Sequence, residues 1–316
     1  MASERPSRSD RIRGGLIGLL VGDALGVPYE FKPPALIPAP AEIEFEPPEG
    51  YPRTYPDIAT GTYSDDGAQA LCLLASLLDR GRLDPDDLGH RLLNWYENGY
   101  LAVGGNVFDV GIQTSEALRA LRGGTPALEA GPVQERANGN GSLMRVLPLA
   151  LWHKGTDEEL AADACTQSQV THGHIRSQLC CALYCLWARR TLEGNDLDSG
   201  WASATATLRD LLADDPDGLN EFNLSLRPDA PPEATGRGYV VDSLHSARWA
   251  TAAGSFEQVV KAAVALGHDT DTTAAVAGGI AGLREGLAAI PSRWRDQLLG
   301  REHFEPLLEQ LVESSG

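Results

Sequence analysis

The sequence predicts an all-α fold in a single domain. Apolar residues recur at helical spacing along most of the chain, whereas the period-two alternation of β-strands is scarce. In two segments near opposite ends of the chain, glycine recurs at every fourth residue, which places these glycines on one face of each helix. No linker composition and no solenoid repeat divides the 316 residues. We therefore expect one compact multi-helix domain over residues 11–312, after a disordered tail over residues 1–10.

Charge and cysteine content exclude several classes of protein. The formal charge of −18 and a pI of about 4.7 argue against a nucleic-acid surface or an anionic-membrane surface. No apolar run is long enough to span a membrane, and the arginine-rich residues 1–13 lack the apolar core of a signal peptide. The five cysteines are an odd number without a C-x-x-C motif, so a disulfide framework is not expected. We expect a cytoplasmic monomer.

The first expected helix covers residues 12–27. Its glycines share one face: Gly14, Gly18, Gly22 and Gly26. Because each interior glycine costs roughly 0.5–1 kcal/mol relative to alanine, four on one face indicate that another helix approaches closely. Pro28 should end the helix and place Glu30 on a loop. Proline-rich residues 33–56 then predict a long surface loop of the kind that often forms a lid.

Two adjacent carboxylates open the second expected helix. Asp65 and Asp66 follow the hydroxyl of Ser64 and precede apolar residues at helical spacing, and Gly81 should end the helix. Adjacent like charges repel, and only one of the two aspartates can cap the helix. The other carboxylate therefore needs water or a metal ion.

The middle of the chain predicts further helices from the same spacing. They are expected at residues 85–96, 114–121, 158–169 and 175–190, in a segment that ends at residue 250, and at 256–266. Residues 214–232 predict an acidic loop. A glycine loop at residues 139–141 should enter another helix with Ser142 as its cap, and such a loop is a ready anion cradle. A lone histidine such as His172 is most often a surface or core residue.

The most informative stretch runs from Gly267 to Gly279. Asp269 and Asp271 stand there at the mouth of an apolar helix that is expected to begin near Thr272. Two carboxylates and a threonine hydroxyl are oxygen ligands that suit a hard cation such as Mg²⁺ or Mn²⁺. The alternative is an ordinary capped helix, in which Asp271 only satisfies free amide groups.

Asp65 and Asp66 form a second acidic motif at a helix start, like that of Asp269 and Asp271. The presence of two such motifs favours a cation site over an ordinary capped helix. Glycines at positions 278, 282 and 286 repeat the stripe of the first helix, and packing of the two stripes would bring Asp23 and Glu30 near Asp269. If the two helix mouths face each other, four carboxylates converge, and divalent cations are needed to neutralise them. Two metal ions a few ångströms apart are a known hydrolytic device.

The chain resembles the ADP-ribosylglycohydrolase family, which includes dinitrogenase-reductase activating glycohydrolases and vertebrate ADP-ribosyl-acceptor hydrolases. The resemblance runs from about Gly14 to Trp294. It rests on five motifs in order: Gly22-Asp23-x-x-Gly26 with Glu30, Ser64-Asp65-Asp66, Gly139-Asn140-Gly141-Ser142-x-Met144-Arg145, His172, and Gly267-x-Asp269-x-Asp271-Thr272-x-Ala274-Ala275. It implies an orthogonal α-helical fold with two Mg²⁺ or Mn²⁺ ions.

Three positions depart from the family pattern. Ser64 replaces the usual threonine and keeps its hydroxyl, Gly67 replaces a second threonine, and His268 replaces a small or amide residue. The glycine is expected to loosen the surroundings of one metal ion, and the histidine to influence which leaving group is preferred. No carboxylate is missing, so the resemblance implies an active enzyme.

The resemblance also implies a reaction and its residues. The reaction is hydrolysis of an N- or O-glycosidic bond at the distal ribose, which releases ADP-ribose from a modified protein or another acceptor. The implied metal-binding positions are Ser64, Asp65, Asp66, Asp269, Asp271 and Thr272. The implied catalytic carboxylates are Glu30, Asp65, Asp66 and Asp271, of which an aspartate acts as base, while Glu30 positions substrate or moves a proton.

Substrate binding is expected from the loops. Backbone amides of Gly139, Asn140, Gly141 and Ser142 should hold the pyrophosphate, and Tyr239 or Phe108 should stack on a ring. The other expected substrate-binding positions are Asn106, Asp109, Met144, His172 and His268. The acceptor stays open between arginine, serine, a nucleic-acid base and a small molecule.

Two other functions compete with this hypothesis. A non-catalytic relative that binds ADP-ribose or serves structurally is disfavoured by the intact carboxylate set. A different metal-dependent nucleotide hydrolase is disfavoured by Glu30 together with the glycine loop. Release of ADP-ribose rather than AMP would separate the latter from a glycohydrolase.

Overall fold

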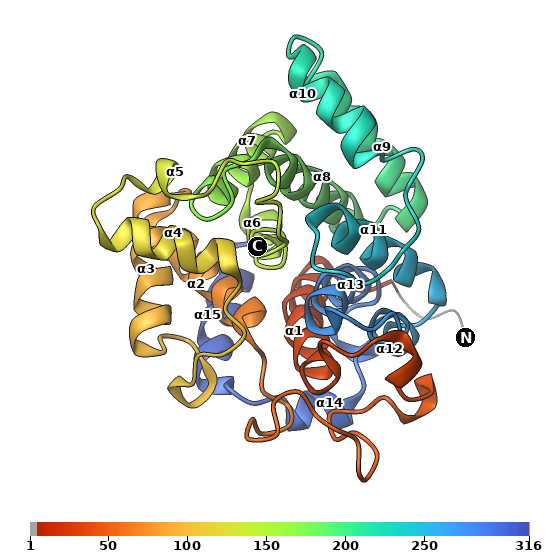
Figure 1. Ribbon diagram of the computed structural model, residues 1–316. Coiled ribbons are helices and arrows are strands. Elements are labelled where there is room, and N and C mark those ends of the chain that lie inside the picture. Colours follow the sequence, from red (N-terminus) through yellow and green to blue (C-terminus); the bar gives the residue numbers. More distant parts are fainter. Residues whose placement is uncertain (1–4, 316) are drawn as a thin grey trace.

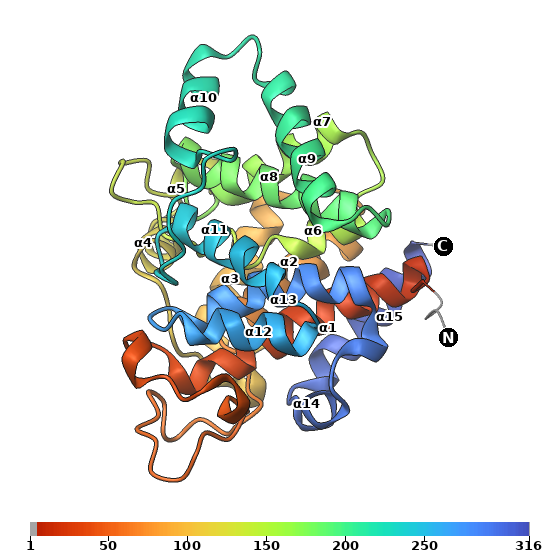
Figure 2. The same cartoon turned by 90° about the vertical axis from the view of Figure 1, so that its right-hand side faces the viewer.

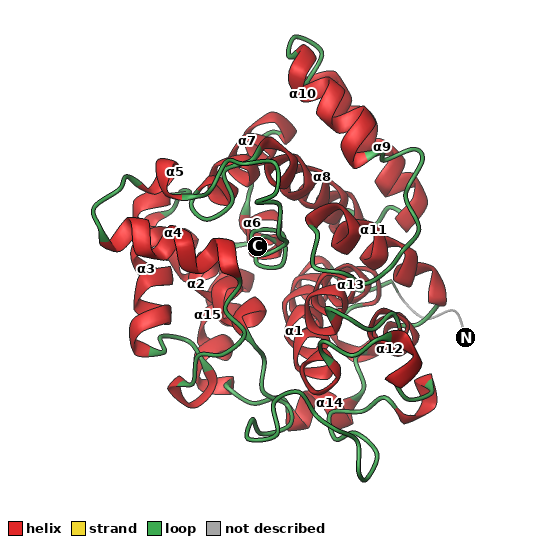
Figure 3. Cartoon of the chain, in the orientation of Figure 1, coloured by secondary structure: helices red, strands yellow, loops and turns green. Residues whose placement is uncertain are grey.

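The computed structural model describes residues 5–315, and the chain in this range consists of helices joined by loops and turns (Figure 3). No β-strand forms among these residues, where Gly139 and Tyr239 pair only as an isolated antiparallel bridge. The all-α fold expected from the sequence is therefore confirmed. None of the described helices combines the length and the apolar character that a membrane span requires.

Fifteen α-helices are found in the described residues. The first eight are α1 (Arg8–Gly26), α2 (Asp65–Arg80), α3 (Pro85–Asn98), α4 (Ile112–Arg122), α5 (Ala127–Ala130), α6 (Leu147–Trp152), α7 (Asp157–Gln169) and α8 (Ile175–Leu192). The others are α9 (Leu197–Leu211), α10 (Pro216–Glu221), α11 (Val240–Ala250), α12 (Phe256–Ala265), α13 (Thr270–Glu285), α14 (Ser292–Gln297) and α15 (Arg301–Ser314).

The two glycine-faced helices, α1 and α13, lie side by side at the centre of the molecule (Figures 1 and 2). They run antiparallel, and each end of the pair is tied. At one end the Thr270 hydroxyl donates to the carbonyl oxygen of Gly26 at 2.8 Å. At the other, the Arg11 guanidinium donates to the carbonyl oxygen of Leu283 at 2.8 Å. The first helix of the chain is thus joined at both ends to a helix that follows it by more than 240 residues.

The glycines permit this contact because their backbones touch. A Cβ atom added at Gly14 would lie 2.3 Å from the carbonyl oxygen of Gly282, and one at Gly18 would lie 2.4 Å from that of Gly278. At Gly22 the same atom would lie 2.1 Å from the carbonyl oxygen of Ala274. These distances are far below contact distance and the clashing atoms are backbone, so the predicted packing of the two stripes is confirmed.

Several helix boundaries differ from expectation. α1 begins at Arg8, because the Ser7 hydroxyl accepts from the amide of Asp10 and caps it, so the expected disordered tail is wrong over residues 8–10. Residues 1–4 of that tail lie outside the described residues. The expected acidic loop at 214–232 contains α10, which Asp215 caps. Helix α9 was not expected, although Asp196 is a recognisable cap for it.

The loop at residues 33–56 is irregular, as expected, with two short 3₁₀ turns (Pro34–Leu36 and Pro40–Glu42). It leads from the end of α1 to the start of α2 along one side of the molecule (Figure 2). The cysteines in the described range are free thiols, and Cys181 and Cys185 are buried in α8 as small core residues.

Candidate active site

The N-termini of α2 and α13 meet in the interior. The Thr272 hydroxyl, in the first turn of α13, donates to Oδ1 of Asp66, in the first turn of α2, at 3.2 Å. The two carboxylate-bearing motifs, about 200 residues apart in sequence, are therefore in direct contact. The packing of α13 on α1 creates this meeting, since the start of α13 lies against Gly26.

The start of α2 differs from the expectation that Asp65 or Asp66 caps it. Ser64 is the N-cap, and its hydroxyl accepts from the amide of Asp66 at 3.3 Å. The carboxylate of Asp23, in α1, accepts from the amides of Ser64 and Gly67, each at 2.8 Å. With the free amides of the helix satisfied by Ser64 and Asp23, both neighbouring aspartates keep their carboxylates for another role.

Close packing explains why position 67 holds glycine. A Cβ atom there would lie 2.8 Å from the side chains of Leu20 and Tyr63, so no threonine fits without rearrangement. The departure from the family pattern at this position follows from the close approach of α1 to α2. The expected loosening around a metal ion stays a prediction.

Helix α13 begins two residues earlier than expected, at Thr270, with Asp269 at the N-cap position. The Asp269 side chain does not cap the helix, because its Oδ2 accepts from the amide group of Asn140 at 2.8 Å. Oδ1 of Asp271 accepts from the amide of Thr272 at 2.9 Å, while its Oδ2 has no partner. The capping interpretation of Asp271 therefore accounts for one of its two oxygens.

Asp65 is oriented by a buried polar chain. Its Oδ2 accepts from Gln69, one helical turn further on, at 2.9 Å. Gln69 in turn accepts from the guanidinium of Arg145 at 3.1 Å, and Arg145 also donates to Gln167 at 3.0 Å. Arg145 is fully buried, and burial lowers its pKa to about 10. The guanidinium thus stays charged at neutral pH and anchors the network.

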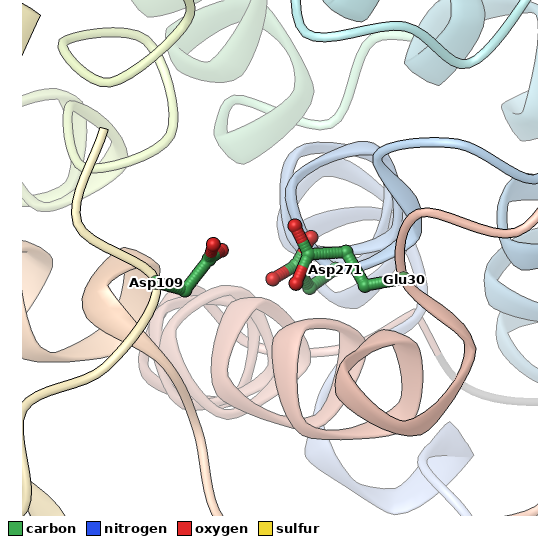
Figure 4. Close-up of side chains that lie close together, drawn as sticks. All are labelled: Glu30, Asp109 and Asp271. Atoms are coloured by element: carbon green, nitrogen blue, oxygen red, sulfur yellow. The ribbon is translucent and has the colours of Figure 1, made fainter. Parts of the chain in front are cut away.

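Two more carboxylates reach this site from loops. Glu30 follows the short turn after α1, and Asp109 lies on the loop before α4. One oxygen from each of Glu30, Asp109 and Asp271 lies within 4.8 Å of the others, and the side chains converge (Figure 4). Asp109 was expected to bind substrate, and the sequence offered no sign that it meets the helix-borne carboxylates.

Tyr55, on the loop before α2, contacts both the segment that carries Glu30 and the segment that carries Asp109. Its hydroxyl donates to Oδ1 of Asp109 at 2.8 Å. Its ring lies edge-on to Phe108, with centroids 5.0 Å apart, and to Phe31 at 6.5 Å. Nothing in the sequence singled out Tyr55, because this contact joins residues more than fifty positions apart.

Burial dominates the electrostatics of the site. It raises the pKa values of Glu30, Asp65, Asp66 and Asp271 well above those of free carboxylic acids, and the neighbouring carboxylates raise them further. For Asp23, burial outweighs the two amide hydrogen bonds and raises the pKa to about 7. Without positive charge, the carboxylates of the site would therefore keep their protons to higher pH than free carboxylic acids do.

The donor set fits hard divalent cations. Glu30 Oε2, Asp66 Oδ2 and Asp271 Oδ2 are buried oxygens without a hydrogen-bond partner. Unsatisfied carboxylate oxygens in the interior cost free energy that a cation would recover. All the atoms concerned are oxygens, which favours Mg²⁺ or Mn²⁺ over softer metals.

The glycine loop lies beside the carboxylates, but its local structure differs from expectation. Ser142 caps no helix, since α6 begins at Leu147; its buried hydroxyl accepts instead from that of Ser168 at 2.8 Å. His172 packs against Gly141, where an added Cβ atom would lie 2.9 Å from the imidazole. Burial lowers the pKa of His172 to about 3, so this ring is neutral.

The remaining expected substrate-binding residues have mixed surroundings. Asn106 is exposed directly after the short 3₁₀ helix Val103–Gly105, and Met144 is buried. Tyr239 is 40% exposed, and its hydroxyl accepts from Arg176 at 3.0 Å. His268 has a left-handed backbone (φ 63°), and its amide donates to the carbonyl oxygen of Lys32 at 2.7 Å, which joins it to the Glu30 segment. Their roles toward substrate stay predictions.

Asp23, Gln69 and Tyr55 are the site residues that sequence reasoning did not assign. A lone carboxylate amid the apolar residues of α1 was a signal for Asp23, because a buried charge requires partners. The position of Gln69 one turn after Asp65 was a further signal. For Tyr55 the sequence holds no comparable indication.

An all-helical fold in which buried carboxylates converge from two helix N-termini and two loops defines a candidate metal-dependent enzyme. The ADP-ribosylglycohydrolase family model matches residues 4–316, and the chain belongs to this family. It is accordingly an enzyme that hydrolyses glycosidic bonds. The resemblance read from the sequence motifs is confirmed.

Individual proteins support this assignment. ADP-ribosylarginine hydrolase Tri1 of Pseudomonas putida (strain GB-1) is 31% identical over 308 residues, which cover 96% of this chain and 78% of that protein. The ADP-ribosyl-(dinitrogen reductase) glycohydrolase of Rhodospirillum rubrum is 28% identical, covering 93% and 92%. A solved structure of an ADP-ribosylglycohydrolase-related protein complex has a TM-score of 0.74 at 34% identity and covers 98% of this chain and 99% of its own.

Proposed function

We propose that the protein is a metal-dependent hydrolase that releases ADP-ribose from ADP-ribosylated arginine. The observation that carries this proposal is the convergence of unpartnered buried oxygens from Glu30, Asp66 and Asp271, in a chain that belongs to the ADP-ribosylglycohydrolase family. The bond to be cleaved joins the anomeric carbon of the distal ribose to the acceptor.

We propose that two Mg²⁺ or Mn²⁺ ions bind between the two helix mouths. Their ligands would come from carboxylates and hydroxyls of α2 and α13: Ser64, Asp65, Asp66, Asp269, Asp271 and Thr272. When bound, the ions would supply positive charge that holds the ribose hydroxyls and stabilises charge that develops during hydrolysis. At the start of α2, Ser64 and not Asp65 or Asp66 caps the helix, and at the start of α13 Asp271 uses only Oδ1 on a backbone amide.

The loop carboxylates would then handle substrate and protons. Glu30 and Asp109 face Asp271 from segments outside the helices, so they can act on a ribose held at the helix mouths. We propose that one of them moves a proton between water and the reacting centre, as paired carboxylates do in other glycosidases. The neighbouring glycine loop, residues 139–142, would hold the pyrophosphate with backbone amides.

The charge of the site supports arginine as the acceptor. Seven carboxylates gather there, namely Asp23, Glu30, Asp65, Asp66, Asp109, Asp269 and Asp271. Two divalent cations carry four positive charges, too few to balance all of these carboxylates, so the remaining acids can pair with a cationic leaving group such as a guanidinium. A relative that is 31% identical is named an ADP-ribosylarginine hydrolase, which agrees with this choice.

A product assay tests the proposal. Peptides that carry ADP-ribose on arginine or on serine are incubated with the enzyme and Mg²⁺ or Mn²⁺, with and without EDTA. We expect free ADP-ribose and unmodified arginine peptide, no AMP, and no turnover after chelation. Activity that survives exhaustive chelation would contradict the metal dependence, and a preference for the serine peptide would contradict the acceptor assignment.

Ligand binding tests whether the site recognises the distal ribose of ADP-ribose. ADP-ribose at about 100 times its Kd should stabilise the fold by roughly 2.7 kcal/mol. AMP lacks the distal ribose and should stabilise it much less. Equal shifts from the two ligands, with or without metal, would contradict the placement of the distal ribose at the helix mouths.

We also propose a cytoplasmic location, because the free cysteines of the described range fit a reducing compartment. The monomeric state stays a prediction that light scattering can test.

A further inference from the structure

A short piece of the loop before α2 bridges the two segments that carry the loop carboxylates. The Thr54 hydroxyl donates to the backbone carbonyl oxygen of Glu30. The next residue, Tyr55, donates through its hydroxyl to Oδ1 of Asp109 at 2.8 Å. Consecutive residues thus hold the Glu30 segment by its backbone and the Asp109 segment by its carboxylate.

The Tyr55 ring reinforces this bridge. It lies edge-on against Phe31, which follows Glu30, and against Phe108, which precedes Asp109. Edge-on aromatic pairs of this kind stabilise the contact beyond the apolar area that they bury. Tyr55 is therefore the aromatic residue that joins the two loops, and its hydroxyl reaches past the ring contact to the carboxylate.

The two joined segments have strained backbones. Phe31 has φ 59° and Asp109 has φ 55°, both in the left-handed region that side chains other than glycine rarely adopt. Backbone strain of this kind persists where surrounding contacts fix it. At Asp109, the hydrogen bond from Tyr55 fixes the side chain of a residue whose backbone alone would prefer another conformation.

We propose that Tyr55 is a positioning residue for the hydrolysis, which fixes the Asp109 carboxylate opposite Glu30 and Asp271 by donating a hydrogen bond to its outer oxygen. This proposal rests on the proposed function of the same site. The hydroxyl takes one oxygen of Asp109, and the carboxylate is held with an oxygen within 4.8 Å of the other two acids (Figure 4).

The geometry predicts how kcat and KM should change in the Tyr55→Phe variant. This change removes the hydroxyl and keeps the ring, so the aromatic contacts with Phe31 and Phe108 remain. Because the hydroxyl fixes the Asp109 carboxylate, its removal should lower kcat by roughly tenfold or more if the Asp109 geometry governs the reaction. KM for the ADP-ribosylated peptide should change by less than about threefold, because the lost contact acts at the reacting centre.

A double-mutant cycle tests whether Tyr55 acts through Asp109. Single-turnover rates are compared for the wild type, Tyr55→Phe, Asp109→Asn and the double variant. If Tyr55 positions Asp109, the double variant should be no slower than Asp109→Asn alone. Losses that multiply would show that Tyr55 works independently of Asp109 and would overturn the proposal.

Tyr51 provides a matched control on the same loop. Its ring packs against Tyr29 at 5.1 Å, and its hydroxyl has no hydrogen-bond partner. Tyr51→Phe therefore removes a hydroxyl without removing a hydrogen bond, and its kcat should stay within about twofold of the wild type. An equal loss in the two variants would show a general effect of the loop and would also overturn the proposal.

A structural readout keeps the test independent of turnover. In a crystal structure of metal-free Tyr55→Phe, the Asp109 carboxylate should be turned away from Glu30 or disordered, while α2 and α13 are unchanged. An Asp109 side chain in its original place would contradict the positioning role even if activity fell. If the wild type itself released no ADP-ribose, the proposed function would fail, whereas a fully active Tyr55→Phe would remove only this inference.

Discussion

The candidate site has a helix-borne half and a loop-borne half, and the two are held in different ways. Asp66 and Asp271 stand in the first turns of α2 and α13, which pack on α1 through glycine contacts and buried hydrogen bonds. Glu30 and Asp109 stand on irregular segments with left-handed residues at or beside them. A few hydrogen bonds and aromatic contacts hold these two acids in place.

The difference indicates a division of labour. Metal ions need ligands at defined distances, and helix N-termini on a close-packed pair supply them rigidly. A substrate must enter and leave, and carboxylates on loops can move with it while their anchors restore the active arrangement. The helix-borne half should therefore control folding and metal binding, and the loop-borne half should control rate.

The largest expected effect is a loss of stability when the glycine contact between α1 and α13 is disrupted, because this contact supports the helix-borne half. In Gly22→Ala, the new Cβ atom would lie 2.1 Å from the carbonyl oxygen of Ala274, so the two helices must separate. We expect a loss of about 3 kcal/mol or more in the free energy of unfolding, measured by urea denaturation.

Gly89 provides a matched control, since it also lies inside a helix. Its nearest atoms are those of the Leu121 side chain at 3.4 Å, an ordinary contact distance. Gly89→Ala should stabilise the protein by roughly 0.5–1 kcal/mol through helix propensity. Similar effects of the two changes would show that the glycine contact does not require glycine.

The next largest effect is expected from the helix-borne carboxylates. Asp271→Asn removes one charge and leaves an oxygen that can still accept from the Thr272 amide, so the helix should persist. Turnover should fall on the order of 10³-fold with loss of metal-induced stabilisation. Circular dichroism checks the fold and calorimetry checks metal binding. Full activity of this variant would favour a capping role for Asp271.

A smaller loss should follow a change in the loop-borne half. Glu30→Gln keeps the size of the side chain and the backbone contact with Thr54. We expect kcat to fall by roughly 10²-fold, the usual scale for a positioned acid or base, with metal affinity unchanged. Unchanged kcat together with lost metal binding would show that Glu30 belongs to the metal-binding half.

The smallest expected effect is a pH dependence of metal stabilisation. The buried carboxylates have raised pKa values, about 7 for Asp23, so the metal-free folded state binds more protons than the unfolded state. Its stability should therefore fall as pH rises toward and through 7, because these groups must ionise while buried. Metal ions replace the protons, so the rise in Tm on adding Mg²⁺ should be larger at pH 8 than at pH 6.

The comparison of Tm values measured with and without Mg²⁺ also controls for other groups that titrate. His172 and His245 have pKa values lowered mainly by burial, and they affect stability equally with and without metal. Comparing the Tm shift at each pH cancels their contribution. A shift that is independent of pH would indicate that the carboxylates do not exchange protons for metal.

The sequence by itself determined the features that rest on local chemistry. Helical spacing predicted the all-α class, and glycine at every fourth residue predicted the packing of α1 on α13. The paired aspartates near residues 65 and 270 predicted two acidic helix mouths, and only the structure shows that these are in contact. These inferences hold because periodicity, glycine spacing and capping residues act within a few turns of chain.

The tertiary structure alone decided which groups take which hydrogen bonds. Asp23 takes the amides of α2 and releases Asp65 and Asp66 from capping, Ser142 turns into the core, and Tyr55 meets Asp109. Each of these contacts joins residues distant in sequence. The glycine spacing predicts that α1 and α13 pack together, but no local pattern specifies which side chains then meet, so the geometry of the site appears only when the chain is folded.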